Sequence, residues 1–357
     1  MNITNITAQP ITIPLTTTFT TSLRATNKVD CVLVKVHTDN GQIGYGSGSP
    51  VPEISGETVK SVVGAIDFIG EHLIGMTLEN SELLFQKLNN CIIGSTSAKA
   101  AIDMAIYDLL AKSLDIPLYQ LLGGRSQKLT TDITISLASP EKMVAECTKM
   151  VKEGFTILKI KVGSDPQIDI ERLKKIHESF SGKTLIRIDA NQGWTAKEAV
   201  YVCRALEQAK VPIDLVEQPV AAGDLEGMRF VRDNTLFPVF ADESIFSPAD
   251  ALKFIEHSAI DGINIKLMKC GGIYNALKIV AIAESAGIPC MIGSMMESHL
   301  SVLAAAHLAV SKTTINRFDL DAPIFCETNP LAPGLSYDGA TVCLSAEPGF
   351  APSSLTL

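Results

Sequence analysis

Charged residues recur at nearly regular intervals in the second half of this chain, and each one ends a short apolar run. The five residues are Lys161, Asp189, Glu217, Asp242 and Lys266, spaced 24 to 28 residues apart. Each interval has room for one strand and one helix, as in a repeated βα unit. Because the strands of a barrel built from such units all end on one face, the spacing predicts that the five side chains meet there.

Eight β-rich runs follow one another after residue 130, and helical patterns fill most of the gaps between them. Short apolar runs without polar alternation are typical of parallel strands that are buried on both faces. We therefore expect an α/β fold built on a TIM-like (β/α)8 barrel. The predicted strands are Asp132–Ser136, Ile157–Lys161, Leu185–Asp189, Ile213–Glu217, Pro238–Asp242, Gly262–Lys266, Pro289–Gly293 and Ile315–Asp319.

The first 125 residues follow a different pattern, in which strands come before helices and do not alternate with them. Such grouping indicates an α+β domain. We predict this domain in residues 1–125, the barrel in residues 126–321, and a C-terminal segment, residues 322–357, that packs back toward the first domain. The predicted strands of the first domain are Ile3–Ile13, Cys31–Thr38 and Ile43–Ser47.

The composition favours a large packed core and argues against two classes of partner. Hydrophobic residues make up 46% of the 357 residues and charged residues only 19%, so disorder is not expected. A net charge of −9 argues against nucleic acid or a membrane surface as a partner, because both bind basic patches. The eight cysteines form no CxxC motif, and neither a secretory signal nor a run of about 18 apolar residues is present. We expect a cytoplasmic protein.

Three of the predicted strand ends carry carboxylates. Asp189, Glu217 and Asp242 come from consecutive strands, so their side chains would repel one another unless a cation lay between them. Hard oxygen ligands with no His or Cys nearby suit Mg²⁺ or Mn²⁺ rather than zinc. The alternative is that the three carboxylates form structural ion pairs with lysines.

Lysines flank this predicted metal site on two sides. Lys159 and Lys161 lie two apart on one strand and face the same way, and Lys266 ends a strand across the barrel. Repulsion between neighbouring ammonium groups would lower a lysine pKa toward neutrality, which suits a general base. A carboxylate substrate bound by the metal would then have one base on each face, and this geometry inverts a stereocentre. The metal would stabilise the negative charge left when the α-proton departs.

The chain resembles the enolase superfamily and, within it, the muconate-lactonizing-enzyme subgroup. The resemblance extends over nearly the whole chain, and it implies that the first domain caps the barrel. By this resemblance Asp189, Glu217 and Asp242 bind Mg²⁺, Lys161 and Lys266 form the acid/base pair, and Lys159 assists Lys161. It rests on five motifs: Lys159-Ile160-Lys161, Asp189-Ala190-Asn191, Glu217-Gln218-Pro219, Asp242-Glu243-Ser244 and Asn264-Ile265-Lys266.

Within that subgroup, Asp319-Leu320-Asp321 resembles the motif with which dipeptide epimerases hold the α-ammonium group of their substrate. The resemblance therefore implies an isomerase that moves the α-proton of the C-terminal residue of a dipeptide. Three other subgroup activities stay open as alternatives: o-succinylbenzoate synthase, N-succinylamino acid racemase and muconate cycloisomerase. The motif also has a plainer interpretation, as solvated loop charges or a helix N-cap.

Arg24 lies in a threonine- and serine-rich stretch, Thr16–Thr26, that resembles the mobile specificity loop of the capping domain. In the L-Ala-D/L-Glu epimerases of the family an arginine in this loop binds the glutamate side chain, and Arg24 fits that role. The leading substrate is therefore L-Ala-D/L-Glu, with hydrophobic and cationic dipeptides as alternatives. Because barrels of this class often form symmetric oligomers, we expect a homo-oligomer. The pocket is expected to include Thr134, Ser136, Ser294 and Met296.

A glycine-rich run, Gly44-Tyr45-Gly46-Ser47-Gly48, has the composition of a phosphate-binding loop. Ser49-Pro50 follows it rather than a helix, so its context excludes a dinucleotide site. By the family resemblance, the run is a second loop of the capping domain that lies over the site.

Overall fold

A sheet of eight parallel strands forms the centre of the computed structural model, which describes residues 1–180, 184–331 and 334–350. The strands follow in chain order around the sheet. Asp132 N donates to Phe318 O at 3.2 Å and so brings the first and last strands together. The predicted (β/α)8 barrel is confirmed. Its strands are β5 (Ile133–Ile135), β6 (Ile157–Lys161), β7 (Leu185–Asp189), β8 (Ile213–Glu217), β9 (Val239–Ala241), β10 (Gly262–Ile265), β11 (Cys290–Gly293) and β12 (Ile315–Asp319).

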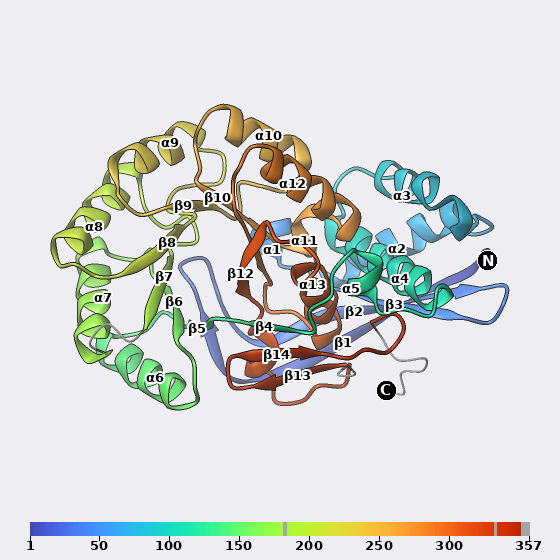
Figure 1. The fold of residues 1–357 in the computed structure, drawn as a ribbon, viewed down its shortest axis with the longest axis horizontal. Helices are drawn as coiled ribbons and strands as arrows, with labels where there is room; N and C mark the ends of the chain where they lie inside the picture. The colour runs from blue at the N-terminus through green and yellow to red at the C-terminus, as the bar shows by residue number, and fades with distance from the viewer. Residues whose placement is uncertain (181–183, 332–333, 351–357) are drawn as a thin grey trace.

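Helices lie around the outside of the barrel (Figure 1). One of them, α8, begins at a capping box, in which Thr195 Oγ1 accepts from Glu198 N at 3.3 Å and Glu198 accepts from Thr195 N at 2.8 Å. Ala199, Cys203 and Leu206 of this helix are buried at helical spacing. The helices are α6 (Pro140–Lys152), α7 (Pro166–Phe180), α8 (Ala196–Gln208), α9 (Leu225–Asn234), α10 (Pro248–Glu256), α11 (Leu267–Cys270), α12 (Ile273–Ser285) and α13 (His299–Ala309).

The first domain is an antiparallel three-stranded sheet with helices packed against it. The glycine run predicted as a loop over the site is instead a strand, paired with β2. A Cβ at Gly44 or Gly46 would collide with carbonyls of Ala105 and Ala101 in α4. The glycines thus allow a helix to approach the strand closely. The elements are β1 (Ile3–Thr20), β2 (Ala25–Thr38), β3 (Ile43–Gly48), α1 (Pro52–Ser55), α2 (Val59–Leu73), η1 (Leu78–Asn80), α3 (Ser81–Asn90), α4 (Thr96–Ser113) and α5 (Leu118–Leu121).

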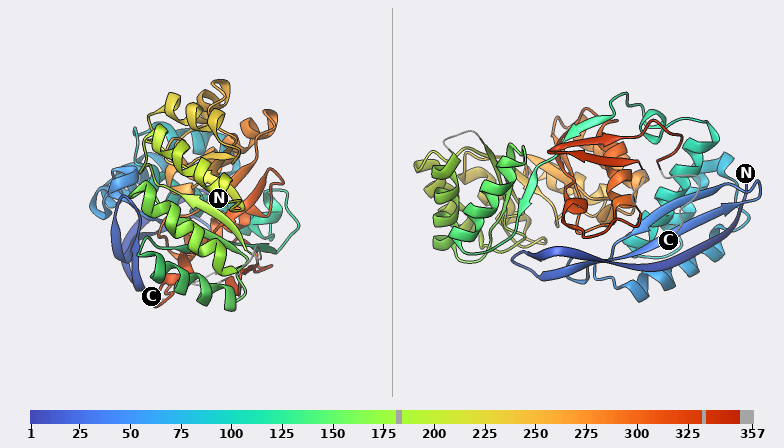
Figure 2. Two further views of the ribbon diagram at one scale, coloured as in Figure 1. Left: turned by 90° about the vertical axis from the view of Figure 1, so that its left-hand side faces the viewer. Right: turned by 90° about the horizontal axis from the view of Figure 1, so that it is seen from below.

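Strands β1 and β2 form a hairpin that is longer than the sequence predicts. Pairing continues to Thr20 opposite Ala25, so the stretch expected to be a mobile loop consists of strand ends around a tight turn. The many β-branched threonines of this stretch favour an extended backbone. The right-hand view of Figure 2 shows the hairpin reaching from the first domain to the barrel. The turn at its tip therefore lies at the site described below.

A third sheet, in the order β13-β14-β4, joins the segment after the barrel to the segment before it. Leu118 N donates to Gly349 O at 2.8 Å and Phe350 N to Asp108 Oδ1 at 3.0 Å, which ties the end of this region to the first domain. The predicted domain boundaries stay predictions. No helix in the described residues is long and apolar enough to cross a membrane. The remaining elements are β4 (Lys128–Thr130), η2 (Ala322–Phe325), β13 (Leu335–Asp338) and β14 (Thr341–Leu344).

Candidate active site

The five charged residues that recur along the sequence meet at one end of the barrel. Lys161, Asp189 and Glu217 are the last residues of β6, β7 and β8, and the sheet register pairs Lys161 with Asp189 and Asp189 with Glu217. Asp242 and Lys266 directly follow β9 and β10. All five are at most 5% exposed. Their convergence follows from parallel strands of matched register ending on one face.

Asp189, Glu217 and Asp242 form a tight acidic cluster. One carboxylate oxygen from each lies within 4.8 Å of the others. Lys159 Nζ lies 3.1 Å from Asp189 and 2.8 Å from Glu217, and Lys161 Nζ lies 2.6 Å from Asp189. The ammonium groups supply the positive charge without which three buried carboxylates could not all ionise.

The pKa values of the cluster record this competition between burial and charge. Burial raises the pKa of Asp189, but the opposite effect of Lys161 and Lys159 is larger. The resulting pKa is about 2. Burial and the neighbouring Asp189 raise the pKa of Glu217 to about 7, against the opposing effect of Lys159. The sequence-based expectation that repulsion lowers the lysine pKa is wrong for Lys159. Although burial lowers its pKa, Asp319, Glu217 and Asp189 raise it well above its ordinary value.

The donor set fits a hard divalent cation. Glu217 Oε2 and Asp242 Oδ1 accept no well-directed hydrogen bond from the described residues, although an ammonium nitrogen lies within 2.8 Å of each. Each of these oxygens therefore has an ion pair but no aligned hydrogen bond, so a lone pair remains available to a cation. Three carboxylates with such oxygens, and no His or Cys in the cluster, match the preference of Mg²⁺ and Mn²⁺ for oxygen ligands.

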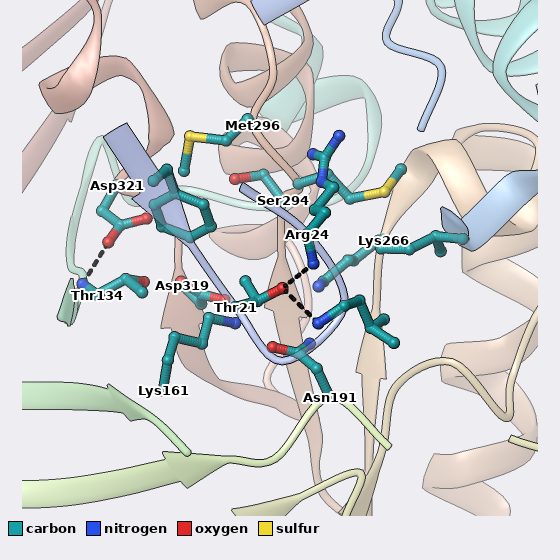
Figure 3. Close-up of a pocket in the computed structure, with 14 residues that line it drawn as sticks. Thr21, Arg24, Thr134, Lys161, Asn191, Lys266, Ser294, Met296, Asp319 and Asp321 are labelled. Carbon is teal, nitrogen blue, oxygen red and sulfur yellow. Dashed lines mark hydrogen bonds between the residues drawn. The ribbon is translucent and has the colours of Figure 1, made fainter. Parts of the chain in front are cut away.

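Lys161 and Lys266 enter one pocket from different sides of the barrel (Figure 3). Their strands, β6 and β10, are four places apart in the order of the eight-stranded sheet. Lys266 Nζ lies 2.7 Å from Asp242, just as Lys161 Nζ lies 2.6 Å from Asp189. The pocket has about 500 Å³ of empty space, part of it open to solvent, a size that suits a small-molecule ligand. A ligand at its centre can meet one amine on each face.

A second acidic group lies at another side of the pocket. Asp319 and Asp321 both line the pocket, and a carboxylate oxygen of Asp132 lies within 4.8 Å of one from each of them. Asp319 accepts from Lys159 at 2.7 Å, and Asp132 pairs with Arg187 at 2.7 Å. Asp321 has no salt bridge within the described part of the chain, and its Oδ2 accepts from the backbone N of Thr134 at 2.5 Å. Burial and the neighbouring Asp319 raise the pKa of Asp321 to about 7.

Arg24 lines the pocket from the tip of the β1–β2 hairpin, and Ser294 and Met296 line it from the loop after β11. The Arg24 side chain is 19% exposed, and its guanidinium lies 3.8 Å from Glu53 of α1. Burial lowers its pKa, which Glu53 partly offsets. Ser136 is not among the lining residues; its Oγ accepts from Thr20 N at 3.4 Å and so contacts the hairpin instead.

Sequence reasoning missed Lys269 and assigned no role to Asn191, Glu243 and Asn264, although these three belong to the quoted motifs. Lys269 Nζ lies 2.7 Å from Asp242 Oδ1, and Asn264 Nδ2 donates to Glu217 Oε1 at 2.7 Å. Asn191 Nδ2 donates to Glu243 Oε1 at 3.1 Å, next to Asp242. Each lies within three residues of a predicted site residue. For Lys269 and Asn264, the available signal was a polar residue in an otherwise apolar segment.

Comparison with known proteins places the chain among related sequences. Residues 2–123 match the model of the mandelate racemase / muconate lactonizing enzyme N-terminal domain, and residues 142–351 match the enolase C-terminal domain-like model. The chain is 47% identical to an L-Ala-D/L-Glu epimerase from Clostridium acetobutylicum over 95% of each chain.

Two solved structures are also very similar. A substrate-liganded L-Ala-D/L-Glu epimerase from Bacillus subtilis has a TM-score of 0.97 and 42% identity, covering 98% of each chain. A dipeptide epimerase from Enterococcus faecalis, complexed with Mg and L-Leu-L-Tyr, has a TM-score of 0.95 and 41% identity over 98% of this chain and 99% of that one. These coverages include both the first domain and the barrel.

Proposed function

This chain belongs to the mandelate racemase / muconate lactonizing enzyme family, and from that premise we propose that it is a Mg²⁺-dependent dipeptide epimerase. The observation that carries the proposal is the pair of buried amines, Lys161 and Lys266, on opposite sides of one pocket beside a carboxylate cluster. The Clostridium and Bacillus relatives named as L-Ala-D/L-Glu epimerases support the same activity.

Asp189, Glu217 and Asp242 would hold the divalent cation. Their clustered oxygens, two of them without a well-directed hydrogen bond, support this assignment, and the Mg complex of the Enterococcus relative favours Mg²⁺. When bound, the cation supplies electrostatic stabilisation of the charge that develops on the substrate carboxylate. Carboxylates neutralised by a cation also raise the pKa of neighbouring ammonium groups less.

The two lysines would move the proton. One of them, as the free amine, removes the α-proton of the C-terminal residue from its face, and the other, as the ammonium, delivers a proton to the opposite face. The roles exchange for the opposite diastereomer, so the reaction is reversible. Lys159, held by Asp319 at 2.7 Å, would keep the field around Lys161 positive. Burial of both bases excludes water, which would otherwise compete for the proton transfer.

Asp319 and Asp321 would bind the α-ammonium group of the dipeptide. Asp321 faces the pocket with no cationic partner in the described residues, so a substrate ammonium can supply the missing charge. The Thr134 N–H fixes the Asp321 carboxylate from behind. An N-succinylamino acid or a muconate offers no cation here, and the arrangement therefore favours a dipeptide over the alternative substrates of the subgroup.

Arg24 supports an acidic C-terminal residue as the leading choice. Its guanidinium reaches the pocket from the capping side and is paired only at 3.8 Å with Glu53, so a substrate carboxylate can compete for it. We propose L-Ala-D/L-Glu as the leading substrate. Hydrophobic dipeptides are the second candidate, because Met295, Met296 and Ile54 line the same pocket and the Enterococcus relative was solved with L-Leu-L-Tyr.

The test measures incorporation of solvent deuterium at the α-carbon. The protein is incubated with a dipeptide library in D2O containing Mg²⁺, and the mass of each dipeptide is followed by mass spectrometry. We expect exchange with L-Ala-L-Glu and L-Ala-D-Glu. Lys161→Ala and Lys266→Ala should each abolish epimerization, while each retains exchange of only the diastereomer whose α-proton faces the remaining lysine. Lys175→Ala, which removes an exposed lysine of α7, is the control and should behave as wild type. Native-rate epimerization by the Lys266→Ala protein would refute the two-base mechanism.

A further inference from the structure

The tip of the β1–β2 hairpin is a tight turn whose shape is set by its own hydrogen bonds. Thr21 N donates to Arg24 O at 2.9 Å, and Thr21 Oγ1 accepts from Leu23 N at 3.2 Å and from Arg24 N at 3.3 Å. Figure 3 shows the two bonds to the Thr21 hydroxyl. These bonds link Thr21 to Arg24, so Ser22 and Arg24 belong to one compact turn.

Ser22 connects this turn to the barrel. Its hydroxyl lies 2.9 Å from Ala190 O and 3.1 Å from Asn191 O, in the turn that follows β7. A hydroxyl has one proton, so the two carbonyls share it in a bifurcated hydrogen bond. Leu137 N also donates to Thr20 O at 3.0 Å, but that bond joins two backbone groups and survives any substitution at Ser22.

The turn that receives Ser22 is next to the candidate metal cluster. Asn191 has a φ of 42° and Gln192 a φ of 68°, left-handed values that cost energy for residues other than glycine and persist only where neighbours hold them. Asn191 N donates to Asp189 Oδ1 at 2.9 Å, and its side chain donates to Glu243 at 3.1 Å. The carbonyl that accepts from Ser22 therefore belongs to a residue that fixes Asp189.

We propose that Ser22 is a positioning residue that keeps the hairpin tip closed on the barrel and so sets the distance from Arg24 to the Asp189 cluster. The inference rests on the proposed function, in which one substrate carboxylate lies at that cluster and the other at Arg24. A fixed distance between the two ends would select the length of the substrate side chain. An aspartate side chain, one methylene shorter than glutamate, would then reach less far toward Arg24.

The closure of the hairpin tip can be tested without measuring enzyme activity, by limited trypsin digestion of the Mg²⁺-loaded protein. Cleavage after Arg24 requires the tip to leave the barrel, and its rate follows the population of the open form. Loss of one hydrogen bond in Ser22→Ala should speed this cleavage about two- to tenfold. Ser22→Thr, which keeps the hydroxyl, should restore the slow rate. Rates are normalised to cleavage of a peptide of residues 18–30 with the same substitution.

Thr26→Ala is the matched control on the same hairpin. The Thr26 hydroxyl donates to Lys28 O at 2.9 Å and accepts from Lys28 N at 3.3 Å, so its hydrogen bonds stay within the hairpin. Its removal should leave cleavage after Arg24 unchanged. If Ser22→Ala is cleaved after Arg24 no faster than wild type, the closure role of Ser22 is wrong, whatever the enzyme kinetics show.

The preference between dipeptides of different side-chain length tests whether Ser22 sets the distance from Arg24 to the Asp189 cluster. Ser22→Ala should raise KM for L-Ala-L-Glu about two- to tenfold with kcat nearly unchanged, and lower the preference for L-Ala-L-Glu over L-Ala-L-Asp by a similar factor. An equal loss for both dipeptides, together with faster trypsin cleavage, would overturn the selection of length. If wild type exchanges no dipeptide at all, the proposed function fails, and the trypsin result still decides whether Ser22 closes the tip.

Discussion

Replacement of Lys159 by methionine tests whether buried ammonium charge balances the carboxylate cluster. Lys159 is 1% exposed, and its Nζ lies 2.7 Å from Asp319, 2.8 Å from Glu217 and 3.1 Å from Asp189. Methionine has a similar length and volume but no charge. The substitution therefore leaves three buried carboxylates facing one another without their shared counter-charge.

The expected cost follows from burial. Removing one partner of a buried ion pair destabilises a protein by about 3–5 kcal/mol, because the remaining charge stays desolvated. Lys159 has three such partners, so we expect Lys159→Met to lose at least that much in metal-free buffer. A ligand at 100 times its Kd adds about 2.7 kcal/mol of stability, and wild type gains from Mg²⁺ as well. We expect the variant to gain more than wild type, since its Asp189 and Glu217 regain a cation while Asp319 does not.

The assay is urea unfolding, followed by circular dichroism, with EDTA and again with Mg²⁺; urea is uncharged and does not screen the ion pairs. The matched control is Lys175→Met, which breaks ion pairs of 2.8 Å to Glu141 and Glu171 at a side chain that is 41% exposed. Solvent screens those pairs, so the control should lose little. The reasoning fails if Lys159→Met without metal is no less stable than Lys175→Met.

Two further predictions concern Asp321 and His307. Asp321→Asn should lower kcat/KM for L-Ala-L-Glu about 10- to 100-fold through the loss of a charge-assisted hydrogen bond, and leave any residual turnover of N-acetyl-L-Ala-L-Glu unchanged; equal losses would contradict an ammonium site. Burial lowers the pKa of His307 to about 3, while its Nδ1 accepts from Tyr119 N at 3.1 Å. The unfolded chain takes up this proton near pH 6.5, so the stability present above pH 6.5 is lost as the pH falls toward 3. Between pH 6.5 and 5, the free energy of unfolding of His307→Gln should therefore fall by about 2 kcal/mol less than that of wild type, as measured by urea unfolding. An identical fall in the two proteins would contradict the pKa shift.

The barrel could be predicted because its signals are local. The predicted strand Ile157–Lys161 coincides with β6 residue for residue, and Leu185–Asp189, Ile213–Glu217 and Ile315–Asp319 coincide with β7, β8 and β12. Each is an apolar run of strand length that stands between helical patterns. The charged strand ends then meet because parallel strands share a direction, so their convergence needed no knowledge of side-chain contacts.

Features that depend on distant partners could not be predicted in the same way. Strand β14 pairs with its neighbour β13, but its other edge pairs with β4, more than 200 residues earlier in the chain. The field at Lys159 likewise depends on three carboxylates from other strands. Two neighbouring lysines suggested repulsion, but the spatially adjacent acids reverse the sign of the pKa shift.

The contacts of Gly349 and Phe350 with the first domain have a consequence for synthesis of the chain. Asp108 in α4 accepts a hydrogen bond from the backbone N of Phe350. Asp108 leaves the ribosome 242 residues before Phe350 does. At translation rates of about 5–20 residues per second, the nascent chain waits roughly 12–50 s for that partner. During this interval the edge of β4 lacks its partner β14, whereas Asp108 already pairs with Lys112 of the same helix. We therefore expect the nascent chain to be prone to misassembly until β14 has been synthesised.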